Sequence, residues 1–305
     1  MNHVCTNTRL EFLSIVLLLI LCSCQRNSKE SAINDSNANT LYLSDLKALN
    51  KLHVPLREPK SGEWLYSQRE PGQSFNEYIH SKPVYPYTDR NKIYIRPIGE
   101  FDNIDYTVLN TLREYISVFF GLETILLEVI SDSIIPDQSR RMNDGIEQLH
   151  TKYILNNILI KSMPEDAIVY IAITSKDLYP QEDWNFVFGQ AYLKKRTGVS
   201  SIYRFKYENE EIVDYTLYLN RIMKTATHEL GHMFSLKHCI KYKCLMNGSI
   251  CLSEADNKPS WLCPDCLAKI MWCTNYDIYE RDDSLISFYH KYGNPEKEKF
   301  YRESK

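Results

Sequence analysis

One block of the sequence, from His228 to Cys266, constrains this chain more than any other. It opens with the motif His228-Glu-x-x-His232 and reaches a third histidine at His238. Because positions i and i+4 share one face of a helix, a helix here directs the imidazoles of His228 and His232 at one metal ion. Glu229 lies beside them, where its carboxylate can accept a proton from a water that the ion activates. Three protein ligands with an open fourth position are typical of catalytic zinc.

The competing interpretation is a solvated helix face that carries a few histidines by chance. With the His and Glu content of this chain, the five-residue motif is expected in roughly one or two of every hundred shuffled sequences. The third histidine lowers that frequency about fortyfold. The metal site is therefore the favoured interpretation.

Four cysteines follow the histidines in two short pairs, Cys239 with Cys244 and Cys263 with Cys266. Two such pairs separated by a loop are typical of a structural zinc site in a reducing compartment. In an oxidising compartment the same four residues could instead form two disulfides. The residues alone leave both arrangements open.

The N-terminus is predicted to be a targeting segment. Arg9 precedes an apolar run from Phe12 to Leu21, which is too short to span a bilayer and is typical of a signal peptide. The run ends in Leu-Cys-Ser-Cys, which resembles a bacterial lipobox, so we expect Cys24 to carry a lipid after cleavage. An ordinary signal peptide or an uncleaved anchor is the alternative. We expect an exported lipoprotein, anchored to the membrane at the periplasmic or outer-membrane face.

Composition divides the chain into five expected parts. Residues 24–40 are polar and cannot bury enough surface to offset their conformational entropy, so they should form a flexible tether. The expected parts are a signal peptide (1–23), the tether (24–40), an N-terminal extension (41–90), a catalytic domain (91–290) and a charged, frayed tail (291–305). The net charge of -3 gives no footprint for nucleic acid.

Strand and helix patterns alternate after Asn91, which predicts an α/β fold with a mixed sheet. The pattern predicts a helix from Asp102 or Asn103 to Gly121, because these residues are typical helix caps. The other expected elements are strands at 92–96, 124–130, 167–174, 186–193 and 199–205 and helices at 145–160 and 220–234. The segment 187–190 is either a sheet edge that pairs with an extended peptide or an ordinary core strand.

These motifs resemble a known family. The three histidines, Glu229 and the later Met246 are similar to the metzincin clan of zinc peptidases. Within that clan, Cys239 directly after the third histidine, then Cys244-x-Met246 and Cys263-x-x-Cys266, resembles the archaemetzincin (archaelysin) family. The upstream segments 98–102 and 183–190 resemble it too, and the likeness covers residues 91–280.

The resemblance implies a metzincin-like fold with a mixed twisted sheet packed with helices, an active-site helix and a small Cys-rich zinc-binding C-terminal part. It implies two zinc ions in each chain. The implied roles are a catalytic zinc held by His228, His232 and His238, a general base at Glu229, a turn beneath the metal at Met246, and a structural zinc held by Cys239, Cys244, Cys263 and Cys266. The implied activity is hydrolysis of peptide substrates, with aminopeptidase action on short peptides in some members.

One residue departs from the clan. Ser235 stands where the clan has glycine, at the point where the chain leaves the helix with a positive φ. A non-glycine residue in a left-handed conformation costs roughly 1–2 kcal/mol, which predicts another route for the loop that carries His238.

Two other classes of function stay open at this point. One is a binding protein that keeps the fold with little turnover, and the other is a zinc hydrolase that acts on an amide other than a peptide. Glu229 argues against the first, since a protein without turnover does not need a general base.

Overall fold

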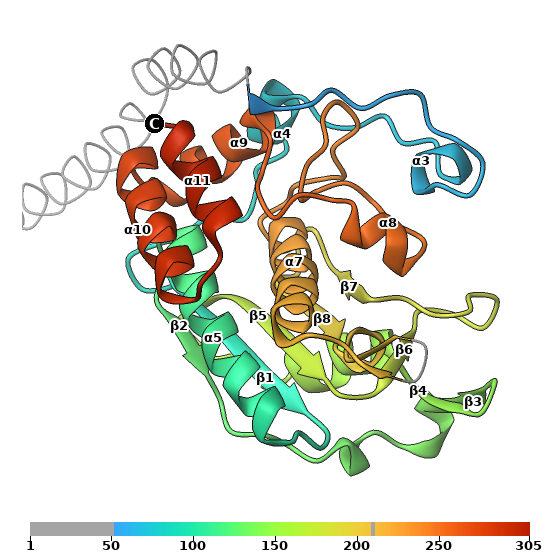
Figure 1. Cartoon of the computed structure of the whole chain (residues 1–305). Helices are drawn as coiled ribbons and strands as arrows, with labels where there is room; N and C mark the ends of the chain where they lie inside the picture. The colour runs from blue at the N-terminus through green and yellow to red at the C-terminus, as the bar shows by residue number, and fades with distance from the viewer. Residues whose placement is uncertain (1–51, 209–210) are drawn as a thin grey trace, which may run out of the picture. The chain divides into compact units, whose positions relative to one another are not determined.

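The computed structural model describes residues 52–208 and 211–305 (Figure 1). The expected signal peptide, the tether and Cys24 lie outside the described residues, as does the start of the N-terminal extension. Among the helices that are described, none is both long enough and apolar enough to cross a membrane.

A five-stranded mixed sheet forms the centre of the molecule, in the order β2-β1-β5-β8-β7. All neighbours are parallel except β7, which runs antiparallel to β8 at one edge. The central β5 is buried along its whole length, as its continuous apolar sequence predicts. The strands are β1 (Lys92–Ile98), β2 (Thr124–Leu126), β5 (Ala167–Thr174), β7 (Gly189–Ala191) and β8 (Thr197–Ser201). The expected strands at 124–130, 186–193 and 199–205 are thus shorter or shifted.

Two long helices lie side by side on one face of this sheet (Figure 1). Helix α5 (Asn103–Phe120) begins at Asp102 with a capping box and ends at Gly121, whose φ is 67°, as predicted. Helix α7 (Tyr215–Met233) packs on β5, β7 and β8 and begins five residues before the predicted start. It starts there because the Asp214 side chain accepts hydrogen bonds from two backbone N–H groups of the first turn.

The helix predicted at 145–160 is wrong in its first half. Residues 146–150 form β4 (Ile146–His150), which pairs with β3 (Arg140–Asn143) and β6 (Asp177–Tyr179) in a second, three-stranded sheet. Asp144 and Gly145 connect β3 to β4 with φ values of 50° and 78°, as a two-residue hairpin turn requires. The hairpin that this turn forms is therefore preferred over the helix that the apolar spacing predicted. Only α6 (Thr151–Tyr153) and a π-helical segment (Ile154–Leu159) follow, and the latter packs against the opposite face of the main sheet.

The last part of the chain is helical, so the prediction of a frayed tail is also wrong. Helix α11 (Pro295–Glu303) packs against α10 (Ile278–Lys291), with Tyr301 2% exposed and stacked on Tyr289. Asn294 caps α11 and Pro295 occupies its first turn, a start signal that the charged composition obscured. The preceding short helices are α8 (Leu252–Asp256) and α9 (Pro264–Thr274).

The described part of the N-terminal extension is packed onto the domain. We call residues 54–84 the strap. It contains α3 (Trp64–Ser67) and α4 (Phe75–His80), and α4 contacts α9. Tyr78 of α4 is fully buried and donates a hydrogen bond to the Phe234 carbonyl at 2.9 Å, directly after α7. The strap therefore reaches the end of the helix that carries the histidine motif.

Candidate active site and cysteine cluster

The three predicted histidines meet at the C-terminal end of α7. His228 and His232 lie one turn apart on the helix, and the chain turns back after it to bring His238 to them. The centroids of the three rings are 4.6 to 5.2 Å apart. One nitrogen from each ring lies within 4.8 Å of the others, so the three side chains can share one ion.

Hydrogen bonds orient the three rings in the same sense. Nδ1 of His228 lies 2.9 Å from the Leu245 carbonyl, and Nδ1 of His232 lies 2.7 Å from the Leu236 carbonyl. A carbonyl only accepts, so both Nδ1 atoms carry the proton and both Nε2 atoms keep a lone pair. Nδ1 of His238 lies 2.9 Å from both carboxylate oxygens of Glu70. Each Nε2 is therefore available as a metal ligand.

The residues fit a zinc ion. Nε2 of His228 and Nε2 of His232 lie 3.1 Å apart with no proton between them, an arrangement that needs a cation. Tetrahedral zinc separates its nitrogen ligands by roughly 3.3 Å. Burial lowers the pKa of His232 to about 3 and that of His228 well below its usual value, so both rings are neutral at pH 7 and can bind metal.

Glu229 is buried beside the histidines, at the edge of the sheet. Burial raises its pKa to about 8, while the Lys258 ammonium opposes that rise. A Cβ atom on Gly189 of β7 would lie 2.6 Å from the Glu229 carboxylate. Glycine at this position of the strand therefore leaves the space that the carboxylate occupies.

Ser235 adopts the left-handed conformation, with φ of 71°, so the loop to His238 does not take the other route that we expected. Its side chain compensates for the unfavourable φ. Ser235 Oγ donates to the Leu193 carbonyl at 2.7 Å and accepts from the Val84 N–H at 3.1 Å. These contacts join the turn to the sheet edge on one side and to the strap on the other.

Met246 lies directly beneath the histidine helix. It is fully buried, and a Cβ on Gly231 would approach its Sδ to 2.5 Å. Gly231 is the residue of α7 just before His232, so its lack of a side chain lets Met246 pack against the backbone of the helix.

A cavity of about 670 Å³ opens in front of the histidines and Glu229. Strand β7 forms one wall, and two tryptophans, Trp64 of α3 and Trp184, line it as well, with ring centroids 6.5 Å apart. Lys258 also lines it and donates to the Asn247 carbonyl at 2.9 Å. The strap therefore contributes to the wall of the cavity and leaves the cavity open.

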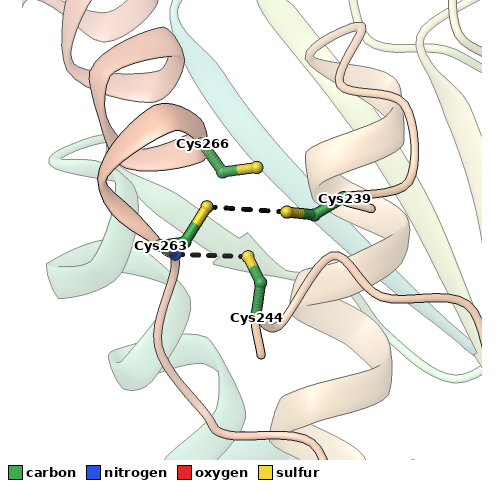
Figure 2. Close-up of side chains that lie close together, drawn as sticks. All are labelled: Cys239, Cys244, Cys263 and Cys266. Carbon is green, nitrogen blue, oxygen red and sulfur yellow. Dashed lines mark hydrogen bonds between the residues drawn. The ribbon is translucent and has the colours of Figure 1, made fainter. Parts of the chain in front are cut away.

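The four predicted cysteines meet beside this site (Figure 2). Cys239 and Cys244 come from the loop after α7, Cys263 caps α9, and Cys266 lies in its first turn. All four are buried and free. Sγ of Cys239 and Sγ of Cys263 are 3.6 Å apart, far beyond the length of a disulfide bond and close to the roughly 3.8 Å between sulfur ligands of tetrahedral zinc.

The cluster has further features of a thiolate metal site. Backbone N–H groups of Met246 and Cys263 point at Sγ of Cys244, at 3.4 and 3.2 Å. These donors stabilise negative charge on sulfur, as a zinc site requires.

Asn247 connects the cysteine cluster to the turn at Met246. Its side-chain amide donates to the Cys239 carbonyl at 2.8 Å, and its Oδ1 accepts from the Cys244 N–H at 2.8 Å. The Cys239 N–H in turn donates to the Met246 carbonyl at 2.8 Å. His238 precedes Cys239 directly, so the cluster and the third histidine share one hydrogen-bonded loop.

Comparison with known proteins gives the family. The model of peptidase family M54 matches residues 137–271. Archaemetzincin-2 of Rattus norvegicus is 33% identical over 287 aligned positions, which cover 83% of this chain and 79% of that protein. Archaemetzincin-2 of Homo sapiens is 35% identical, over 80% of this chain and 74% of that protein. The chain belongs to the archaemetzincin family. It is therefore a zinc metallopeptidase, a hydrolase.

A solved archaemetzincin has the same fold. The crystal structure of the Methanopyrus kandleri protein is 27% identical, with a TM-score of 0.50, and the match covers 96% of that chain but 61% of this one. This archaemetzincin thus has a substantial part with no counterpart in that structure.

Sequence reasoning missed several residues of this archaemetzincin that lie at the site. Glu70 and Trp64 belong to the N-terminal extension, to which the sequence analysis assigned no function, and Lys258 follows α8. No local pattern marks them, because each reaches the site through a contact distant in sequence. Trp184 and Gly189 lie inside the segment 183–190, where the family resemblance was the available signal.

Proposed function

We propose that this archaemetzincin hydrolyses peptides at the histidine site, with zinc held by His228, His232 and His238. The observation that carries the proposal is the common orientation of the three rings, each with Nδ1 held by an acceptor and Nε2 directed inward. When bound, zinc supplies a Lewis acid that polarises the scissile carbonyl and lowers the pKa of the attacking water.

Glu229 acts as the general base. Its carboxylate takes a proton from the attacking water and then gives it to the leaving amine. Burial alone raises the pKa of Glu229 to about 8, which would leave much of it protonated at pH 7; a cation held by the histidines would lower this pKa, so that the ionised carboxylate can accept the proton. Gly189 keeps the space around this carboxylate open.

The edge strand β7 binds the peptide. Ser201 N–H donates to the Phe188 carbonyl and Tyr192 N–H to the Thr197 carbonyl, so the backbone groups of Gly189 and Ala191 point away from β8. They face the cavity that β7 lines, where an extended substrate can pair with them. This supports the edge interpretation of the segment 187–190.

A second zinc is held by Cys239, Cys244, Cys263 and Cys266, and its role is structural. The sulfur separation and the N–H donors to Cys244 support metal rather than two disulfides. All four positions are filled by protein sulfur, so no open position is left for a substrate. Total metal analysis of the purified protein tests this, with two zinc ions per chain as the expected result.

A peptide library tests the activity and separates the alternatives. Wild type should cleave it and Glu229→Gln should not, with both proteins retaining zinc. Equal cleavage by the two would indicate a contaminating protease, and no cleavage by either would favour a binding protein or a hydrolase of another amide. N-acetylated and C-amidated versions of each cleaved peptide decide whether the enzyme is an aminopeptidase on short peptides: acetylation should then abolish cleavage.

The lipid anchor is a proposal that rests on the N-terminal sequence, namely the apolar run from Phe12 to Leu21 and the residues up to Cys24. Expression in a bacterium with a labelled fatty acid tests it, together with membrane fractionation. Wild type and Cys22→Ala should take up label and Cys24→Ala should not. Label that persists in Cys24→Ala would exclude Cys24 as the lipid-bearing residue.

A further inference from the structure

The loop that carries His238 is held by the strap over most of its length. The Leu56 N–H donates to the Lys241 carbonyl and the Lys243 N–H donates to the Val54 carbonyl, both at 2.8 Å. Closer to the histidine, Gln73 donates to the Ser235 carbonyl at 3.1 Å. His238 differs in this from His228 and His232, which α7 itself holds in place.

Glu70 of the strap makes the contact that orients the His238 ring. Both of its carboxylate oxygens lie 2.9 Å from Nδ1 of His238, whereas the other two histidines use backbone carbonyls. Both oxygens therefore face the same ring nitrogen, as expected of a carboxylate that accepts a hydrogen bond from one N–H group. A carboxylate only accepts, which places the proton on Nδ1 and leaves Nε2 for the metal.

Trp64, also in the strap, packs against the His238 ring. Its ring meets the His238 ring edge-on, with centroids 5.2 Å apart. Trp64 is itself held firmly: its backbone N–H donates to Glu254 at 2.9 Å, and a Cβ on Gly248 would lie 2.3 Å from its ring. Two residues of the strap, Glu70 and Trp64, therefore contact the His238 ring.

We propose that Glu70 is a positioning residue of the active site, which orients His238 and strengthens it as a metal ligand. The strap is then a component of the metal centre, and the catalytic unit extends beyond residues 91–290. A carboxylate on the far nitrogen of a ligating histidine fixes its tautomer and increases its basicity. The inference rests on the proposed histidine zinc site.

The test measures zinc binding by the full chain, by competition with a chromophoric chelator, and the absorption spectrum of the cobalt-substituted protein. Glu70→Ala is expected to lower the zinc affinity of the histidine site roughly 10- to 100-fold and to alter the cobalt spectrum. Glu70→Gln keeps the shape and an acceptor oxygen, so a smaller loss is expected. When the histidine site is free of metal, the thermal unfolding midpoint of the protein should change little in either variant.

Glu77→Gln is the matched control. Glu77 lies on the same strap, where it closes the capping box of α4 with Ser74. This variant weakens the strap without touching the site, so its zinc affinity should remain that of wild type. If Glu77→Gln lowers affinity as much as Glu70→Gln does, Glu70 acts only through the fold of the strap and the inference is overturned.

His238→Ala separates this inference from the proposed function. Loss of one zinc in His238→Ala establishes the histidine site, and wild-type affinity in Glu70→Ala would then refute the role of Glu70 alone. If His238→Ala keeps every zinc that wild type binds, the proposed function itself fails.

Discussion

At the scale of single residues, two positions of this site are decided by the presence or absence of one side chain. Gly189 has no Cβ, and the Glu229 carboxylate occupies the space where one would be. Ser235 has a Cβ in a conformation that favours glycine, and its hydroxyl makes two hydrogen bonds. The first position affects the carboxylate that we propose as the general base, and the second affects the path of the loop to His238.

Gly189→Ala should lower turnover far more than stability. The new Cβ would lie 2.6 Å from the Glu229 carboxylate, so the carboxylate must move. A displacement on the order of 1 Å at a catalytic group can reduce kcat about 100-fold. Steady-state kinetics on a cleaved peptide, with zinc content as the control, measures the effect. Turnover within twofold of wild type would show that Glu229 has another position from which it works.

Ser235→Ala and Ser235→Gly should differ in stability in a defined order. Both lose the two hydrogen bonds, which costs about 1–3 kcal/mol for the groups left without partners. The glycine variant also relieves the left-handed conformation, which is unfavourable for alanine by about 1 kcal/mol or more. The free energy of unfolding in urea should therefore be highest for wild type, lower for Ser235→Gly and lowest for Ser235→Ala. An alanine variant as stable as the glycine variant would contradict this account of φ.

At the scale of elements, local signals predicted what local interactions determine. Asp102 and Gly121 bound α5 because caps act within one turn, and β5 is recognisable because a strand buried on both faces is apolar throughout. The helix predicted at residues 145–160 was wrong in its first half because the apolar spacing there also suits a helix, whereas Asp144 and Gly145 form a hairpin turn.

Contacts between residues far apart in the sequence could not be predicted from local sequence signals. Glu70 and His238 are 168 residues apart, and nothing in the composition of the strap marks one of its acids as a partner of a histidine. The proposed zinc ligands could be picked out because they lie in closely spaced groups along the chain, in α7, in the loop that follows it and at the start of α9. The residues that orient those ligands could not, because tertiary packing brings them together.

Helix α7 and the turn at Met246 pack so closely that Gly231 cannot be replaced without loss. Alanine favours a helix interior by up to about 1 kcal/mol over glycine. The overpacking against buried Met246 should cost about 1–3 kcal/mol and outweigh that gain. Gly231→Ala should therefore destabilise wild type and stabilise a Met246→Ala background. Urea unfolding of wild type, the two single variants and the double variant gives the free energies of a double-mutant cycle. If Gly231→Ala changes the free energy of unfolding with the same sign in both backgrounds, the two residues do not compete for space.

At the scale of the whole molecule, the histidine site and the cysteine cluster share one loop. His238 and Cys239 are adjacent, and the Cys239 N–H donates to the carbonyl of Met246, beneath the histidine helix. Asn247 holds both ends of the same loop through Cys239 and Cys244. Loss of a metal bound by the cysteine cluster should therefore disturb the third histidine, although none of the four clustered cysteines lines the cavity in front of the histidines.

Cys239→Ser should accordingly lose peptidase activity together with the structural zinc. We expect at least one zinc fewer per chain and a loss of turnover of about tenfold or more, because ligand orientation controls metal affinity on that scale. Cys251→Ser is the matched control: Cys251 lies in the same part of the chain but outside the cluster, near Ser253, and should keep both zinc and turnover. Metal analysis and kinetics on the same preparations decide the outcome. If Cys239→Ser loses the structural zinc but keeps wild-type turnover, the strap and α7 hold His238 in place without the cysteines. That result would refute the coupling between the two sites.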